Sequence, residues 1–258
     1  MAAPLSEMLA FLWRPPRKEP GVKSRPLNRF DPENHHYYSN WGFTIYRTYY
    51  GEDSDKHWNT LLGALRQQTR LAVGYYDDPE VMVEDKYWKQ GPYKKEGRYI
   101  NQLNLFKDLF RLFPREDPSL LDGSDIGSIR EVCLKEHAEA EEKMEGARFC
   151  FVLVADEAVL KGISQNQFFI KAVGYDWTET EGGWGWDRLR TGDLLDLWEM
   201  LLVSHEEGRS KYYSMRYDEP EEYLERNIWL GDFGLPFFGK FSQIVTEGPK
   251  PPRSSVNS

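Results

Sequence analysis

The spacing of hydrophobic residues predicts a strand and then an amphipathic helix early in the chain. Residues 42–50 are rich in aromatic and β-branched side chains and are followed by Gly51, which is typical of a strand. After them, apolar or half-polar residues recur every three or four positions, at Trp58, Leu61, Leu62, Leu65 and Thr69. This period predicts a helix, and Asp53 or Ser54 is the expected N-cap.

Two further helices are predicted in the middle of the chain. One helical stripe holds Leu103, Phe106, Phe110 and Phe113, so we expect a helix over residues 101–113 that ends before Pro114. A second helix is expected over residues 125–137. The preceding residues 74–100 show no sustained period, and we expect them to form an exposed excursion.

The second half of the chain begins with a continuous apolar run over residues 148–155, which predicts a central strand covered on both faces. A helical turn over 157–162 and a strand over 168–175 follow. A later helix carries one apolar face, formed by Leu194, Leu197, Trp198, Leu201 and Leu202. The last predicted elements are a strand over 212–217 and a helical turn over 221–225.

The order of these elements predicts the fold class. Strand, helix, helical insertion, strand, strand, helix and strand together match a βαββαβ pattern. We therefore expect an α+β protein, a ferredoxin-like sandwich with its helices on one face of the sheet. The helical insertion lies between the first helix and the second strand.

The two ends of the chain differ in composition from its body. Residues 1–30 are basic and rich in proline, which predicts a mostly disordered tail with a short helix at about 6–13 that docks onto the body. Residues 31–246 are expected to form a single α+β domain. Residues 247–258, with three prolines, are expected to form a disordered C-terminal tail.

Composition narrows the possible functions. The 258 residues carry 33 Lys and Arg against 42 Asp and Glu, a net charge of −9, which argues against general binding of nucleic-acid backbones. No apolar stretch approaches the roughly 18 residues that span a bilayer. Two cysteines are too few for a disulfide framework. We expect a soluble, acidic, cytoplasmic protein that does not bind membranes.

Several phrases of the sequence resemble a family of uncharacterised fungal proteins, mainly from ascomycetes. The resemblance rests on residues 42–51 (GFTIYRTYYG), 113–117 (FPRED), 152–156 (VLVAD) and 171–177 (KAVGYDW). It covers roughly residues 43–230 and leaves out the tails. The resemblance implies a shared fold and source, and it implies no activity and no site residues.

The segment from Asp176 to Asp193 is the best candidate for binding. It is rich in glycine and is followed directly by a predicted helix, whose N-terminal N–H groups favour anions. Arginine can bind anions through two hydrogen bonds, and tryptophan supplies a large rigid contact area. The expected ligand-binding residues are Trp177, Trp184, Trp186, Arg188, Arg190 and Thr191. The alternative is that these rings cover the sheet edge and the arginines pair with nearby acids.

Other groups of reactive residues support weaker hypotheses. His35 and His36 follow two carboxylates, as metal ligands do, but a polar entry loop is the preferred interpretation and we expect no metal. Acid–base catalysis could use His57, Asp176 or Asp187, although no nucleophile motif accompanies them. Phosphate-binding glycine loops are absent from the sequence, so we expect no cofactor.

Three functions remain open at this stage. The first is a binding protein that recognises a protein partner or a small anionic or aromatic ligand through the Trp/Arg segment. The second is a small-molecule enzyme of ferredoxin-like architecture that works by His/Asp acid–base chemistry, with unknown catalytic residues. RNA binding through the basic N-terminal tail is a third and weaker hypothesis.

Overall fold

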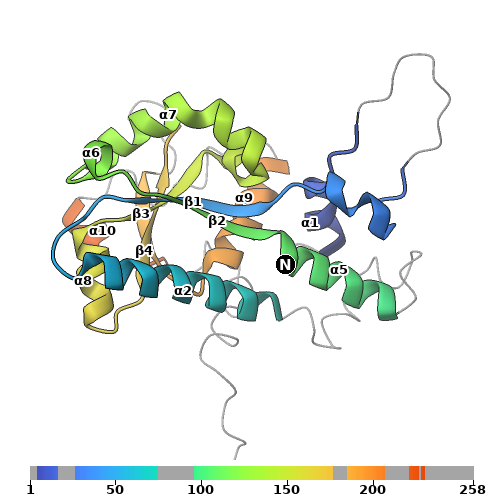
Figure 1. The fold of residues 1–258 in the computed structure, drawn as a ribbon, viewed down its shortest axis with the longest axis horizontal. Helices are drawn as coiled ribbons and strands as arrows, with labels where there is room; N and C mark the ends of the chain where they lie inside the picture. The colour runs from blue at the N-terminus through green and yellow to red at the C-terminus, as the bar shows by residue number, and fades with distance from the viewer. Residues whose placement is uncertain are drawn as a thin grey trace, which may run out of the picture.

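A computed structural model describes residues 5–16, 27–74, 96–176, 185–206, 221–226 and 228–229. In this part of the chain, five strands form one mixed sheet in the order β2-β1-β3-β4-β5 (Figure 1). The strands are β1 (Trp41–Arg47), β2 (Phe110–Arg115), β3 (Phe151–Ala155), β4 (Phe169–Gly174) and β5 (Trp186–Arg190). Strand β1 runs parallel to β2 and β3, whereas β4 is antiparallel to β3 and β5. The fold is therefore α+β, as expected.

Helices cover both faces of the sheet. Figure 1 shows α6 (Pro118–Leu121) and α7 (Ile126–Lys143) on one side, and α2 (Ser54–Val73) and α8 (Glu157–Ser164) on the other. The second side also holds α1 (Leu5–Leu12), α5 (Glu96–Leu109) and α9 (Leu194–Glu206), which contribute to the same hydrophobic core. The short α10 (Glu221–Arg226) adds Leu224 to the core under α7.

Strand β3 is buried on both faces, and this explains its continuous apolar sequence. Phe151, Leu153 and Ala155 belong to the core on the α2 side, while Val152 and Val154 belong to the core under α7. The alternation follows from the period of two along a strand. The expectation of a central strand covered on both faces is confirmed, since β3 is also the middle strand of the sheet.

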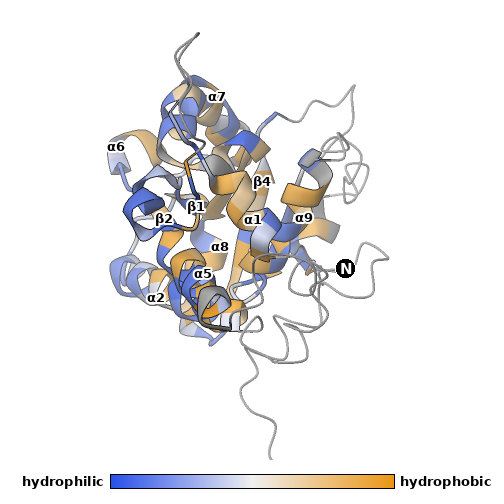
Figure 2. Ribbon diagram, turned by 90° about the vertical axis from the view of Figure 1, so that its right-hand side faces the viewer, coloured by the Kyte–Doolittle hydropathy of each residue, from blue (hydrophilic) through white to orange (hydrophobic). Residues whose placement is uncertain are grey.

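The N-terminal helix α1 is part of the core. Phe11 stacks on Phe149, with ring centroids 5.5 Å apart, and meets Trp198 of α9 edge-on at 6.2 Å. In Figure 2, α1 and α9 lie next to each other and are coloured largely as hydrophobic. The short helix expected at about 6–13 therefore forms and docks. Most of the remaining N-terminal tail (17–26) and the C-terminal tail (247–258) lie outside the described residues.

Helices whose sequence has a clear hydrophobic period form where the sequence predicted them. All five residues of the predicted stripe on α2, from Trp58 to Thr69, are buried. The N-cap is Asp53, but its side chain makes no capping hydrogen bond, and the hydroxyl of Ser54 donates to the carbonyl of Gly51 instead. The helix predicted over 125–137 is α7, which continues to Lys143. The helical turns expected at 157–162 and 221–225 are α8 and α10.

The helix predicted over residues 101–113 was wrong at its C-terminal end. Helix α5 ends at Leu109, and residues 110–115 form strand β2, which pairs in parallel with β1. Phe110 and Leu112 are buried because alternate residues of a strand point to the same face of the sheet, and not because they share a helical stripe. Pro114 is compatible with β2 because β2 is an edge strand of the described sheet.

Other features of the expected topology also differ. Residues 186–190, expected in a loop, form β5. The first two residues of the strand expected over 148–155, Arg148 and Phe149, belong to a 3-10 helix, η3 (Glu145–Phe149). The ferredoxin-like arrangement is not confirmed, because the sheet is mixed and helices cover both faces. The strand expected over 212–217 and most of the excursion expected over 74–100 lie outside the described residues.

A helix that spans a bilayer needs about 20 predominantly apolar residues, and this requirement can be checked for the described helices. Over that part of the chain, no helix is long and apolar enough to span a membrane.

Candidate functional site

A cleft of about 600 Å³ lies between helix α5 and the segment that precedes β1. This volume is within the range of about 300–1,000 Å³ that small-molecule sites occupy. Amide side chains are prominent in its lining, so we call it the amide cleft. Its walls come from two segments, residues 29–38 and residues 101–108, which the fold brings together.

Helix α5 supplies the first wall. Asn101, Asn104 and Asp108 line the cleft and are spaced three or four residues apart, so they share one helical face. Phe106 is fully buried, and its ring stacks on Trp41 with centroids 4.5 Å apart. The indole Nε1 of Trp41 donates to the carbonyl of Phe106 at 2.7 Å. These contacts attach α5 firmly to the sheet.

Gln102, on the same helix, also lines the amide cleft. Its side chain is only 6% exposed, and its Nε2 is buried without a hydrogen-bond partner in the described structure. A buried donor that lacks an acceptor costs about 1–3 kcal/mol of stability. Native proteins satisfy most buried polar groups, so such a group requires an explanation. A bound molecule with an acceptor atom would satisfy it once the Gln102 side chain turns towards the cleft that this residue lines.

The second wall is ordered by local hydrogen bonds. The side chain of Asn28 accepts from the backbone N–H of Phe30 at 3.1 Å, and the Tyr38 hydroxyl donates to the carbonyl of Arg29 at 2.9 Å. Between them, the 3-10 helix η1 (Pro32–Tyr37) begins at a proline, which suits a first helical position. The wall is therefore held in one shape before any ligand arrives.

Planar side chains line this second wall. The guanidinium of Arg29 lies over the ring of Phe30, 4.9 Å from its centroid. The rings of His35 and Tyr38 meet edge-on, with centroids 6.1 Å apart. All four side chains line the amide cleft. They provide flat surfaces opposite the amides of α5.

The two adjacent histidines that resemble metal ligands in the sequence have different surroundings. His35 lines the amide cleft, whereas the ring of His36 packs on Tyr37 with centroids 3.9 Å apart. Over the residues that the structure describes, no group of three or more His, Cys, Asp or Glu side chains is placed to hold a metal ion. The polar segment expected before β1 forms the short 3-10 helix η1, which has no buried residue.

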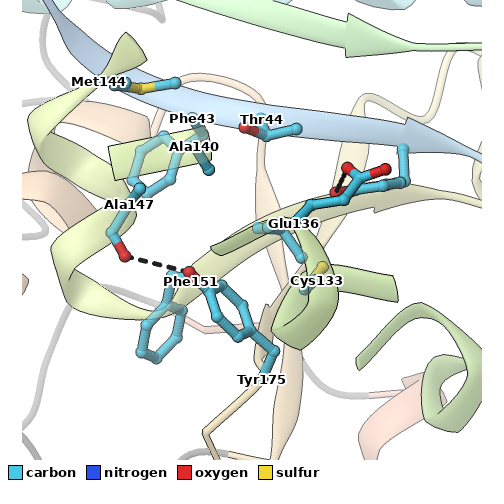
Figure 3. Close-up of a pocket in the computed structure, with 11 residues that line it drawn as sticks. Phe43, Thr44, Cys133, Glu136, Ala140, Met144, Ala147, Phe151 and Tyr175 are labelled. Atoms are coloured by element: carbon cyan, nitrogen blue, oxygen red, sulfur yellow. Dashed lines mark hydrogen bonds between the residues drawn. The ribbon is translucent and has the colours of Figure 1, made fainter. Parts of the chain in front are cut away.

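A second, much smaller hollow lies beneath α7 (Figure 3). Figure 3 shows Cys133 and Glu136 reaching into it from α7, and Tyr175 from the end of β4. The hydroxyl of Tyr46 donates to Glu136 Oε2 at 3.1 Å, and that of Tyr175 donates to the carbonyl of Ala147 at 3.0 Å. Its volume of about 10 Å³ is at the lower limit for one water molecule.

Burial keeps the reactive groups of this hollow neutral. It raises the pKa of the Cys133 thiol to about 12, and the nearby charge of Glu136 adds to the effect. The pKa of the Tyr46 phenol is also raised, first by burial and then by Cys133 and Glu136. Glu136 itself forms an ion pair with Arg115. A protonated thiol and phenol cannot act as a nucleophile and a base, so the hollow is a packed polar network.

We expect the free energy of unfolding to fall as the pH rises from 9 towards 12. The Cys133 thiol ionises near pH 9.0 in the unfolded chain but keeps its proton to about 12 when folded. In that window the unfolded state releases a proton that the folded state holds, which costs up to about 1.4 kcal/mol per pH unit. Urea titrations at several pH values should show a shallower fall for Cys133→Val. An equal fall of the free energy of unfolding with pH in the wild type and in Cys133→Val would contradict the raised pKa of Cys133.

The Trp/Arg segment is only partly described. Trp177 and Trp184 lie outside the described residues. Trp186 lies in β5 and is 6% exposed, and its ring packs in the core under α7. The ammonium of Lys171 sits 4.4 Å from the centroid of this ring and also pairs with Asp156 at 2.7 Å. Trp186 therefore contacts the protein interior.

The other expected ligand-binding residues have internal partners. Arg188 packs on Phe169 and donates to a backbone carbonyl of α10. Arg190 makes two hydrogen bonds to Asp193, and Thr191 is 1% exposed and donates to the side chain of Gln68. Burial raises the pKa of Asp193, while Arg190 opposes this shift. Because Asp193 directly precedes α9, a carboxylate of the chain itself already lies where an external anion was expected.

The residues considered for acid–base catalysis belong to separate elements. His57 lies in the first turns of α2, Asp176 follows β4, and Asp187 is buried in β5. None of the three lines the amide cleft or the hollow beneath α7.

Sequence reasoning missed the α5 wall of the amide cleft. A possible signal was present, because Asn101, Gln102 and Asn104 place three amides within four residues on a predicted helix. Amides on a helix are usually solvated, however, and only the packing of α5 shows that Gln102 is buried. Of the second wall, His35 was considered for its metal-binding ability.

Comparison of the chain with known protein families, with curated proteins and with solved structures gives no match. The resemblance to fungal proteins therefore stays a prediction.

Proposed function

We propose that this protein binds a small polar molecule in the amide cleft. The observation that carries the proposal is Gln102, a residue that lines a cleft of ligand size and whose buried Nε2 has no acceptor in the described structure. The energetic cost of such a group is removed when a ligand supplies an acceptor. The walls on both sides are ordered by contacts of their own, as preformed binding sites are.

Like the first hypothesis from the sequence, this proposal describes a binding protein. It differs in the location of the site, which is the amide cleft and not the Trp/Arg segment. The described part of the Trp/Arg segment faces internal partners, so recognition of a protein partner there remains a prediction of lower rank. An enzyme that uses a His/Asp pair stays the alternative, because His35 and Asp108 both line the amide cleft. Neither Cys133 nor Cys150 forms a disulfide, which supports a reducing compartment such as the cytoplasm.

Replacing Gln102 with methionine should separate binding from stability. Methionine has a similar shape but no donor, so the ligand-free variant is expected to be more stable than the wild type, by about 1 kcal/mol. Most buried substitutions destabilise, which makes an increase informative. Urea denaturation measures the change, and native mass spectrometry of both proteins purified from their own source measures retention of a small molecule.

Gln67→Met is the matched control, because Gln67 is exposed on α2 and does not line the cleft. This control should leave both stability and ligand retention unchanged. A Gln102→Met protein that is less stable and retains the same molecule would refute the proposal, since Gln102 would then be an ordinary core residue.

A further inference from the structure

Two further cavities adjoin each other between α7 and strand β2, and neither shares a lining residue with the amide cleft. One, of about 150 Å³, reaches α6 at Leu120, and we call it the α6 cavity. The other, of about 200 Å³, is bordered by Phe113, and we call it the Phe113 cavity. Each is well above the roughly 10–15 Å³ that a single water molecule requires. Tyr46, Arg115 and Glu136 line both cavities.

The guanidinium of Arg115 is anchored at one nitrogen. An arginine carries five N–H donors, and in the described structure the hydrogen bonding of this side chain is limited to one bond from Nη2 to Glu136 Oε1. The Arg115 side chain is 46% exposed. A guanidinium presents parallel N–H bonds that match the two oxygens of a carboxylate. Arg115 can therefore bind a carboxylate through its other N–H groups while Glu136 holds it in place.

A carboxylate on Arg115 would lie beside the carboxylate of Glu136, and like charges at such short range repel. Glu136 is itself able to bind a donor. Its Oε2 accepts from the Tyr46 hydroxyl at 3.1 Å, and a carboxylate has about four acceptor positions, so each oxygen can accept a further hydrogen bond. A ligand with an ammonium group next to its carboxylate would satisfy both side chains. An α-amino acid carries these two charges on one carbon atom.

The Phe113 cavity suits the rest of such a ligand. Its apolar lining side chains are Phe113, Pro114, Ala140 and Met144. Glu136 and Ala140, both on α7, also border the small hollow drawn in Figure 3. Because apolar groups gain free energy when they leave water, an apolar side chain is favoured in this cavity. The α6 cavity borders the same ion pair, so Arg115 and Glu136 can shift to admit a ligand without displacing closely packed neighbours.

We propose that the Phe113 cavity and the Arg115–Glu136 pair bind a free α-amino acid with an apolar side chain. The carboxylate of the ligand accepts from Arg115, its ammonium group donates to Glu136, and its side chain occupies the Phe113 cavity. This is a second binding site, separate from the amide cleft, and the inference goes beyond the proposed function.

The test is calorimetric titration of the full chain with leucine, isoleucine, valine, methionine and phenylalanine. At least one amino acid should bind the wild type. The matching amine and carboxylic acid, which are 3-methylbutylamine and 4-methylpentanoate for leucine, each lack one charged group and should bind at least tenfold more weakly. Arg115→Gln should weaken binding of the amino acid at least tenfold. Arg66→Gln is the matched control, because Arg66 is exposed on α2 and lines neither cavity, and it should not change binding.

Ala140→Leu tests the cavity separately from the charges. Leucine fills the Phe113 cavity, keeps a good helix former on α7 and leaves Arg115 and Glu136 in place, so binding should again fall at least tenfold. Circular dichroism checks that each variant folds. Failure of all five amino acids to bind would overturn the inference. Binding of the amine or the acid as tightly as the amino acid, or unchanged binding to folded Arg115→Gln or Ala140→Leu, would overturn it as well.

Discussion

Replacing Trp198 with alanine is expected to lower the free energy of unfolding by about 3–5 kcal/mol, the usual cost of removing a large buried aromatic side chain. Trp198 is fully buried in α9, and its ring meets those of Phe149 at 4.9 Å, Trp41 at 5.5 Å and Phe11 at 6.2 Å. One side chain therefore joins α1, β1, η3 and α9. Urea denaturation followed by circular dichroism measures the loss.

The same substitution should also affect the amide cleft. Trp41 connects Trp198 to Phe106 of α5, the helix that carries Gln102. Trp198→Phe keeps most ring contacts and should cost less than alanine. Leu134→Ala serves as the exposed control, because Leu134 is 58% exposed on α7, and it should change stability by no more than about 0.5 kcal/mol. Equal effects of Trp198→Ala and Leu134→Ala would show that the aromatic cluster does not hold these elements together.

Replacing Gly42 with alanine is expected to cost about 3 kcal/mol or more. Gly42 lies in β1 with φ +130°, a conformation that side chains rarely adopt, and a Cβ there would lie 1.9 Å from the carbonyl oxygen of Arg111 in β2. Backbone strain and steric overlap then act together. Because β2 follows α5 directly, any shift of β2 also moves the α5 wall of the amide cleft. Thermal and urea denaturation should both show the loss.

A second glycine provides the matched control. Gly63 is exposed in the middle of α2, and a Cβ there would meet nothing within 4 Å. Gly63→Ala should stabilise the protein by about 0.5–1 kcal/mol, since alanine is the better helix former. Opposite signs for the two identical substitutions are the expected result. A harmless Gly42→Ala would show that β1 and β2 do not pair closely at this position.

Residues with a strong local period could be placed from the sequence. The stripe from Trp58 to Thr69 predicted α2 and its buried face, and the stripe from Leu194 to Leu202 did the same for α9. The apolar run at 148–155 predicted a strand buried on both faces, and the strand forms over residues 151–155. In each case the geometry of a single helix or strand fixes which of its residues share one face. The hydrophobic pattern can therefore be interpreted without knowing which elements pack against it.

Phe110 illustrates why other assignments failed. It continues the helical stripe of Leu103 and Phe106, but a buried strand position also favours an apolar side chain. Its hydrophobicity therefore does not distinguish a helix from a strand. Pairing with Trp41 across β1 and β2 decides in favour of the strand. Trp186 is a similar case, because hydrogen bonding to β4 and contact with Lys171 turn an expected binding loop into a buried strand. Both outcomes depend on partners far away in the sequence.

The sequence by itself determined the α+β class, the positions of the strongly periodic helices and the buried central strand, because these follow from the local alternation of apolar and polar residues. Only the tertiary structure decided the strand order, the conversion of residues 110–115 and 186–190 to strands, and the amide cleft. The cleft depends on two segments more than 60 residues apart and on the burial of one amide, Gln102. Burial of a polar group is set by what packs around it, and no local pattern encodes that.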